Sequence, residues 1–169
     1  LRDIRMELEG LASAKAARGA TRSQITEIRR AAREIMVARN RGDSATDRQK
    51  VREFHFAVYA AAGQPTLLRL IESLWLQTGP YMNLLYPDFI SSSRGPAGRQ
   101  RLIEALQARN ASAARREMTD DIRRALTYVA DLADENGNIA PAAPTTATTT
   151  TKQRRSQLAG ATVFELQAN

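Results

Sequence analysis

The sequence has no cysteine and only one histidine, and aromatic residues make up 5% of its 169 residues. The absence of cysteine excludes a disulfide scaffold, a thiolate zinc site and a cysteine nucleophile. No apolar run reaches the roughly 18 residues that a membrane-spanning helix needs. The charged opening Leu1-Arg2-Asp3 also lacks the apolar stretch of a secretion signal. We therefore expect a cytoplasmic protein with no membrane partner.

Glycine and proline are sparse before the C-terminal region, while alanine, leucine, arginine and glutamate, which favour helices, are abundant. No alternating apolar and polar stretch of useful length predicts a strand. We expect an all-α fold, an antiparallel bundle of six to seven helices. The segments that can be read lie at about 1–18, 21–38, 46–62, 65–85, 96–109 and 111–134.

Local signals set several of these helix limits. Thr21 and Gln24 form a capping-box pair at the start of the second helix. Pro65 suits the first position of the fourth helix, and Gly79-Pro80 predicts a break or kink within it.

Apolar residues at helical spacing predict the faces that point into the bundle. In the first helix these are Ile4, Leu8 and Leu11. In the last helix the stripe consists of Met118, Ile122, Ala125, Val129 and Leu132.

The chain divides by composition near residue 136. Residues 1–136 form the predicted domain. Residues 137–151 are a linker rich in proline, alanine and threonine that cannot build a core. Residues 152–169 are a short tail of unclear role. The net charge is +7, but basic and acidic residues are interspersed along the helices. This pattern is typical of helix faces exposed to solvent and less of a nucleic-acid-binding surface.

Three motifs in order resemble the FCD domain, the ligand-binding domain of the FadR-like branch of GntR transcription regulators. The match covers about residues 1–135. The motifs are Arg5-Met-Glu-Leu-Glu9, Phe54-His-Phe-Ala-Val-Tyr-Ala-Ala-Ala-Gly63, and Leu102-Ile-Glu-Ala-Leu106 followed by Arg109-Asn110, Ala114 and Met118.

The resemblance implies an effector-sensing domain that forms a homodimer. A small molecule, such as an organic acid, would bind in the bundle and control the binding of operator DNA. The DNA would be bound by a winged helix-turn-helix domain, and we see no such domain in residues 1–150. The alternative is a structural helical dimerisation or adaptor domain that binds no ligand.

Metal-binding members of that family use one aspartate and three histidines, and this sequence keeps one of the four. His55 matches the first histidine, whereas Val51 stands at the aspartate position and Arg99 and Asp121 stand at the other two. An arginine repels a metal ion. We therefore expect no metal and no other cofactor, and an internal salt bridge between Arg99 and Asp121 is a possible replacement for the cation.

Five residues are the candidate effector-binding set: Arg5, His55, Tyr59, Arg99 and Asp121. A guanidinium group suits a carboxylate through paired hydrogen bonds, and His55 and Tyr59 would add hydrogen bonds. Other interpretations stay open: Arg5 as a surface arginine, and His55 and Tyr59 as core side chains.

Catalysis is not expected. There is one histidine, no cysteine and no G-x-S-x-G nucleophile motif. The adjacent Asp120 and Asp121 would point about 100° apart on a helix, which does not suit an acid/base pair. The sensor of another helical repressor family, such as the TetR type, remains a further alternative.

Overall fold

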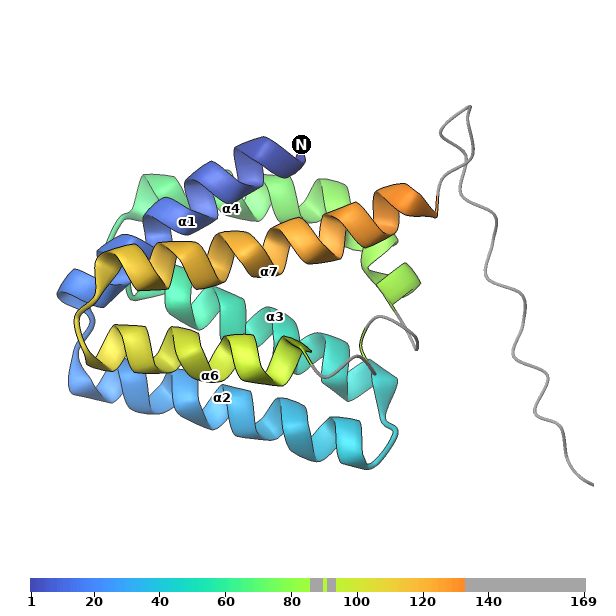
Figure 1. Ribbon diagram of the computed structural model, residues 1–169, viewed down its shortest axis with the longest axis horizontal. Helices are drawn as coiled ribbons and strands as arrows, with labels where there is room; N and C mark the ends of the chain where they lie inside the picture. The colour runs from blue at the N-terminus through green and yellow to red at the C-terminus, as the bar shows by residue number, and fades with distance from the viewer. Residues whose placement is uncertain (86–89, 91–93, 133–169) are drawn as a thin grey trace, which may run out of the picture.

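Six α-helices and one 3-10 helix occupy the part of the chain that the computed structural model describes, residues 1–85, 90 and 94–132. Successive helices run in alternating directions along the bundle (Figure 1). The predicted linker 137–151 and tail 152–169 lie outside the described residues. The elements are α1 (Arg2–Gly19), α2 (Arg22–Asn40), α3 (Ser44–Ala60), α4 (Pro65–Thr78), η1 (Gly79–Leu85), α6 (Arg94–Gln107) and α7 (Ala111–Asp131).

The helix limits follow the local signals in the sequence. The N–H of Thr21 donates to Oε1 of Gln24 at 2.8 Å, and the N–H of Gln24 donates to Oγ1 of Thr21 at 3.2 Å, which confirms the capping box. Helix α4 begins at Pro65, and its α-helical geometry gives way to the 3-10 helix at Gly79, as the Gly79-Pro80 pair predicts.

Helices α1 and α7 lie side by side along much of their length (Figure 1). Small side chains on α1 allow this close approach, and Ala12 and Ala16 are fully buried. At Gly10 an added Cβ would stand 2.8 Å from Cγ2 of Thr119, so any other residue would force Thr119 on α7 to shift. The pairs α2–α3 and α6–α7 complete most of the remaining contacts.

The inner face predicted for the first helix is wrong at Ile4 and Leu11, whereas Leu8 is partly buried and packs against the core. Ile4 and Leu11 are 55% and 37% exposed, whereas Arg5 and Glu9 are buried at 4% and 0% exposure. The buried face is rotated by about one residue, or about 100°, from the apolar stripe. The rotation brings the small residues of α1 against α7 and places the Arg5–Glu9 ion pair in the interior.

The prediction for the last helix holds over most of its length. Met118, Ile122 and Val129 are buried in α7, while Leu132 is 41% exposed because the helix ends at Asp131. None of the described helices combines the length and the apolar character needed to cross a membrane.

Candidate ligand-binding cavity

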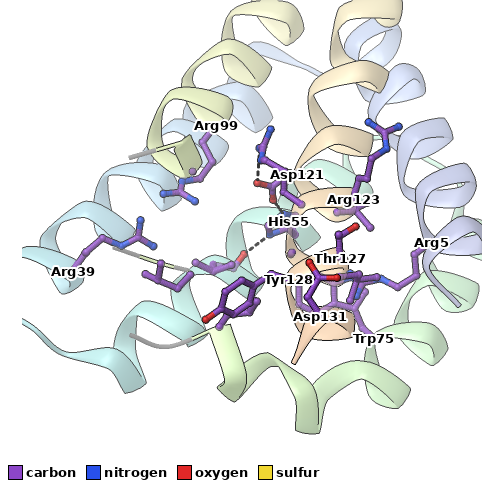
Figure 2. A pocket seen from close by; sticks show the side chains of 18 residues that line it. Arg5, Arg39, His55, Trp75, Arg99, Asp121, Arg123, Thr127, Tyr128 and Asp131 are labelled. Carbon is purple, nitrogen blue, oxygen red and sulfur yellow. Dashed lines mark hydrogen bonds and ion pairs between the residues drawn. The ribbon is translucent and has the colours of Figure 1, made fainter. Parts of the chain in front are cut away.

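A cavity of about 540 Å³ lies within the bundle, bordered by side chains from α1, α3, α4, α6 and α7 and from the end of α2. This volume is within the range of small-molecule sites. Arg39 and Arg99 approach it from one side and Arg5 and Trp75 from the other, with His55 between them (Figure 2). Its described charged lining consists of Arg5, Arg39, Arg99, Arg123, Arg124, Asp121 and Asp131.

The structure brings four of the five candidate effector residues to this cavity. Arg5, His55, Arg99 and Asp121 line it. Tyr59 is 1% exposed and is not part of the described lining. It lies in the core, as the alternative interpretation of this residue expected.

Arg5 is held by a carboxylate of its own chain. Its Nε donates to Oε1 of Glu9 at 2.5 Å and its Nη2 donates to Oε2 at 3.3 Å. Its Nη1 donates to Oγ1 of Thr78 at 3.0 Å, which ties α1 to α4. Much of the guanidinium's donor capacity is therefore already used inside the protein.

Glu9 is the centre of a buried polar cluster. Besides Arg5, it accepts hydrogen bonds from the hydroxyl of Tyr59 and from Nε1 of Trp75, the latter at 3.2 Å. The guanidinium of Arg5 also lies 4.8 Å from the centre of the Trp75 ring. Burial, reinforced by the charge of Glu9, raises the pKa of Tyr59 well above 10.0, so the phenol stays protonated and donates.

His55 links α3 to α7 across the cavity wall. Its Nδ1 lies 2.8 Å from the carbonyl oxygen of Val51, and its Nε2 lies 3.2 Å from Oδ2 of Asp121. The Val51 carbonyl and the Asp121 carboxylate can both only accept, so the two hydrogen bonds together need a proton on each ring nitrogen. The ring also lies 5.4 Å from that of Trp75 and 5.5 Å, edge to face, from that of Phe54.

Asp121 is shared among several cationic groups. Its Oδ1 is 3.2 Å from Nη2 of Arg124, and Arg99 attracts it through the electrostatic field. Burial raises the pKa of Asp121, but the hydrogen bond from His55 and the charges of His55, Arg99 and Arg124 outweigh it and lower the pKa below 3.8. The ion pair expected between Arg99 and Asp121 is thus a longer-range attraction, and Arg124 is the ion-pair partner.

Residues 1–124 match the family model of the FCD domain. The chain belongs to the FCD domain family. The family is one of transcription-regulator domains, which confirms the expectation that the chain is not an enzyme.

Two comparisons relate this FCD domain to one regulator. It is 32% identical over 83 residues to the HTH-type transcriptional regulator McbR of Escherichia coli (strain K12), an alignment that covers 49% of this chain and 38% of that protein. It also resembles the solved structure of E. coli McbR/YncC, with a TM-score of 0.67 and 25% identity, over 75% of this chain and 64% of that one. The chain therefore spans less than two thirds of the relative's length.

Two positions that hold metal ligands in metal-binding members of the FCD family carry residues that cannot bind a metal here. Val51 lines the cavity with an apolar side chain and Arg99 with a cation, so neither can act as a ligand. Within residues 1–85, 90 and 94–132 no group of three histidine, cysteine, aspartate or glutamate side chains is placed to hold a metal ion. That the domain works without a metal stays a prediction.

Sequence reasoning missed several residues around the cavity of the FCD domain. Glu9 lies four residues after Arg5, a spacing that places two side chains on one helix face and could have revealed the pair. Arg124 follows Asp121 by three residues, with the same consequence. Arg39 gave no such signal, because its partner Asp47 lies on the next helix, 3.1 Å away.

Proposed function

We propose that this FCD domain senses a small organic acid, which binds in the central cavity and controls operator binding by a DNA-binding domain of a longer regulator. The observation that carries the proposal is the cavity itself: about 540 Å³, with five arginines and two aspartates in its described lining. Arg5, Arg39 and Arg123 also pair with carboxylates outside that lining, so the acid is expected where Arg99 and His55 lie. Guanidinium groups that line a volume of this size favour an anionic ligand.

The acid binds on the side of Arg99 and His55 in this proposal. Arg5, on the other side, already donates to Glu9 and Thr78, so an incoming carboxylate would have to compete with Glu9 for it. Arg99 lines the cavity and His55 offers Nε2, which an incoming carboxylate could accept from in place of Asp121. Asp121 would then be displaced from His55 when the acid binds.

The signal reaches DNA through a change in the relative positions of helices. His55 lies on α3 and Asp121 on α7, so exchanging their hydrogen bond for one to the ligand alters a contact between two helices. The acid must bind one helix arrangement more tightly than another for this to have an effect. The homologous E. coli protein is named an HTH-type transcriptional regulator, which supports DNA as the final partner.

The outer face of α1 supports the proposed homodimer. Leu1, Ile4 and Leu11 are 49%, 55% and 37% exposed, and their spacing puts them on one side of the helix. An exposed apolar helix face of this kind is a candidate surface for a partner chain. Light scattering on a column should give the mass of two chains, and Ile4→Lys should reduce it toward that of one.

A thermal-shift screen of small carboxylates tests the proposed ligand class. Acetate, lactate, succinate and citrate are natural probes, each compared with its amide or alcohol analogue. A binding acid raises the unfolding midpoint once its concentration exceeds its Kd. Arg99→Ala should abolish this shift. Arg101→Ala is the matched control, because Arg101 is on the same helix but is half exposed and pairs with Glu117.

Two outcomes of the screen would contradict the proposed acid-binding site. If no acid shifts the midpoint, or if Arg99→Ala retains the full shift, the proposed site is wrong. A domain that dimerises but responds to no acid would instead support the adaptor alternative.

A further inference from the structure

A groove runs along the outside of the bundle between α2 and α6, away from the cavity side of these helices. It encloses about 480 Å³. On α2 its wall is a stripe that begins at Arg29 and Arg33 and continues at Met36 and Val37. These positions are four, seven and eight residues after the first, so they share one helix face. On α6 the matching wall is formed by Pro96, Arg99, Gln100 and Ile103.

The two ends of the α2 stripe differ in chemistry. Arg29 and Arg33 form a cationic end, and both are exposed. Met36 and Val37 form an apolar end and are 37% and 49% exposed. A helix rises about 1.5 Å per residue, so the stripe from Arg29 to Val37 is roughly 12 Å long. No carboxylate is among the described residues that line the groove.

We propose that the α2–α6 groove is a second ligand site, separate from the central cavity, for an amphipathic anion such as a medium-chain fatty acid. The acid group binds at Arg29 and Arg33, and the hydrocarbon chain lies along Met36, Val37 and Pro96. An arginine pair offers several donors to one carboxylate, and the apolar end removes the chain from water. Neither end alone would select this class of molecule.

Arg99 connects the groove to the central cavity, because it lines both. It is 8% exposed and lies in the wall that separates the two volumes. An anion in the groove and an anion in the cavity therefore attract the same guanidinium from opposite sides. This coupling rests on the proposed function of the cavity: occupation of either site should weaken binding at the other by the same factor.

Octanoate titrated into the purified protein by isothermal calorimetry tests the groove site. Acetate provides the charge without the chain, and octanol provides the chain without the charge. We expect octanoate to bind and the other two to bind at least about tenfold more weakly, since each lacks half of the contacts. Arg29→Ser combined with Arg33→Ser should weaken octanoate binding by a similar factor.

Arg30→Ser is the matched control, because Arg30 is on the same helix but pairs with Glu27 and Glu34. It should leave octanoate binding unchanged. Equal loss in both variants, no binding by the unmodified protein, or full binding by the double variant would overturn the groove site. So would a change from dimer to monomer in the double variant without any response to octanoate, because the groove would then be an interface between copies.

The two proposals can fail separately. Small acids that bind in the cavity should still shift the unfolding midpoint of the Arg29→Ser, Arg33→Ser variant. Octanoate binding to the groove should in turn persist even if no small acid ever binds in the cavity.

Discussion

The two sides of the cavity treat charge in different ways. On the α1 side, Arg5 faces Glu9, and both are almost fully buried, with donors from Thr78, Tyr59 and Trp75 completing the cluster. On the α7 side, a single carboxylate, Asp121, serves His55, Arg124 and Arg99 and remains 26% exposed. In the first cluster, Glu9 already receives hydrogen bonds from several side chains of the protein. In the second, several cationic groups share the one carboxylate of Asp121.

This difference separates a structural role from a binding role. A buried charge whose partners are all internal is costly to disturb, because removing one partner leaves the other charge buried and unpaired. A partly exposed cluster that is rich in cations can exchange its internal carboxylate for that of a ligand at a smaller cost. We therefore expect substitutions on the α1 side to affect folding most, and those on the α7 side to affect binding most.

Glu9→Ala should give the largest loss of stability. It removes the carboxylate and leaves the Arg5 guanidinium buried without its counter-ion, which costs about 3–5 kcal/mol of unfolding free energy. Urea unfolding followed by circular dichroism measures the loss. Glu7→Ala is the control, because Glu7 lies on the same helix but is 71% exposed. A loss no larger than that of the control would show that the Arg5–Glu9 pair does not hold α1 in place.

Tyr59→Phe should destabilise the domain less, by about 1–2 kcal/mol, because it removes one hydrogen bond to a charged acceptor while preserving the ring. Glu9 would keep the hydrogen bonds from Arg5 and Trp75. The same urea experiment applies, with Tyr81→Phe as the control at a tyrosine that is 45% exposed. Small acids should still bind to the Tyr59→Phe variant. A loss of acid binding without a loss of stability would mean that Tyr59 takes part in ligand binding after all.

The sequence predicted helices better than it predicted the orientation of polar side chains. The capping box at Thr21 and the break at Gly79-Pro80 are local signals, and both are confirmed. The predicted inner face of α1 fails at Ile4 and Leu11 because apolar spacing cannot foresee that a buried face will consist largely of alanines and an ion pair. Here Ile4 is exposed while Glu9 is buried. The close packing of α1 on α7 and the pairing of charges therefore decide which side chains are buried, and hydrophobicity alone does not.

The cavity was predictable only in part, and for a related reason. Arg5, His55, Arg99 and Asp121, which the family resemblance grouped, line one cavity, and their role in binding an effector stays a prediction. It could not show that Arg5 is already occupied by Glu9, because that depends on side-chain geometry in the folded state. Partners on different helices, such as Arg39 and Asp47, were beyond any spacing rule.

The α7 side can be examined through the acid dependence of stability. The pKa of Asp121 is lowered in the folded protein below its ordinary value of 3.8, so the folded state favours the ionised form. Its contribution is complete above about pH 4 and is lost as the pH falls through the lower folded value. Asp121→Asn should therefore reduce stability at neutral pH, by about 1 kcal/mol, the typical net contribution of one hydrogen bond. The gap to the unmodified protein should close at low pH.

Urea unfolding at several pH values between neutral and strongly acidic conditions would measure this gap. Asp120→Asn is the neighbouring control, since Asp120 pairs with Arg123 and makes no contact with His55 among the described interactions. In the same variant a small acid should bind more tightly, because the internal carboxylate no longer competes for His55 and Arg124. A gap that is constant with pH, together with weaker acid binding, would mean that Asp121 assists the ligand. The two sides of the cavity would then differ less in role than their charges suggest.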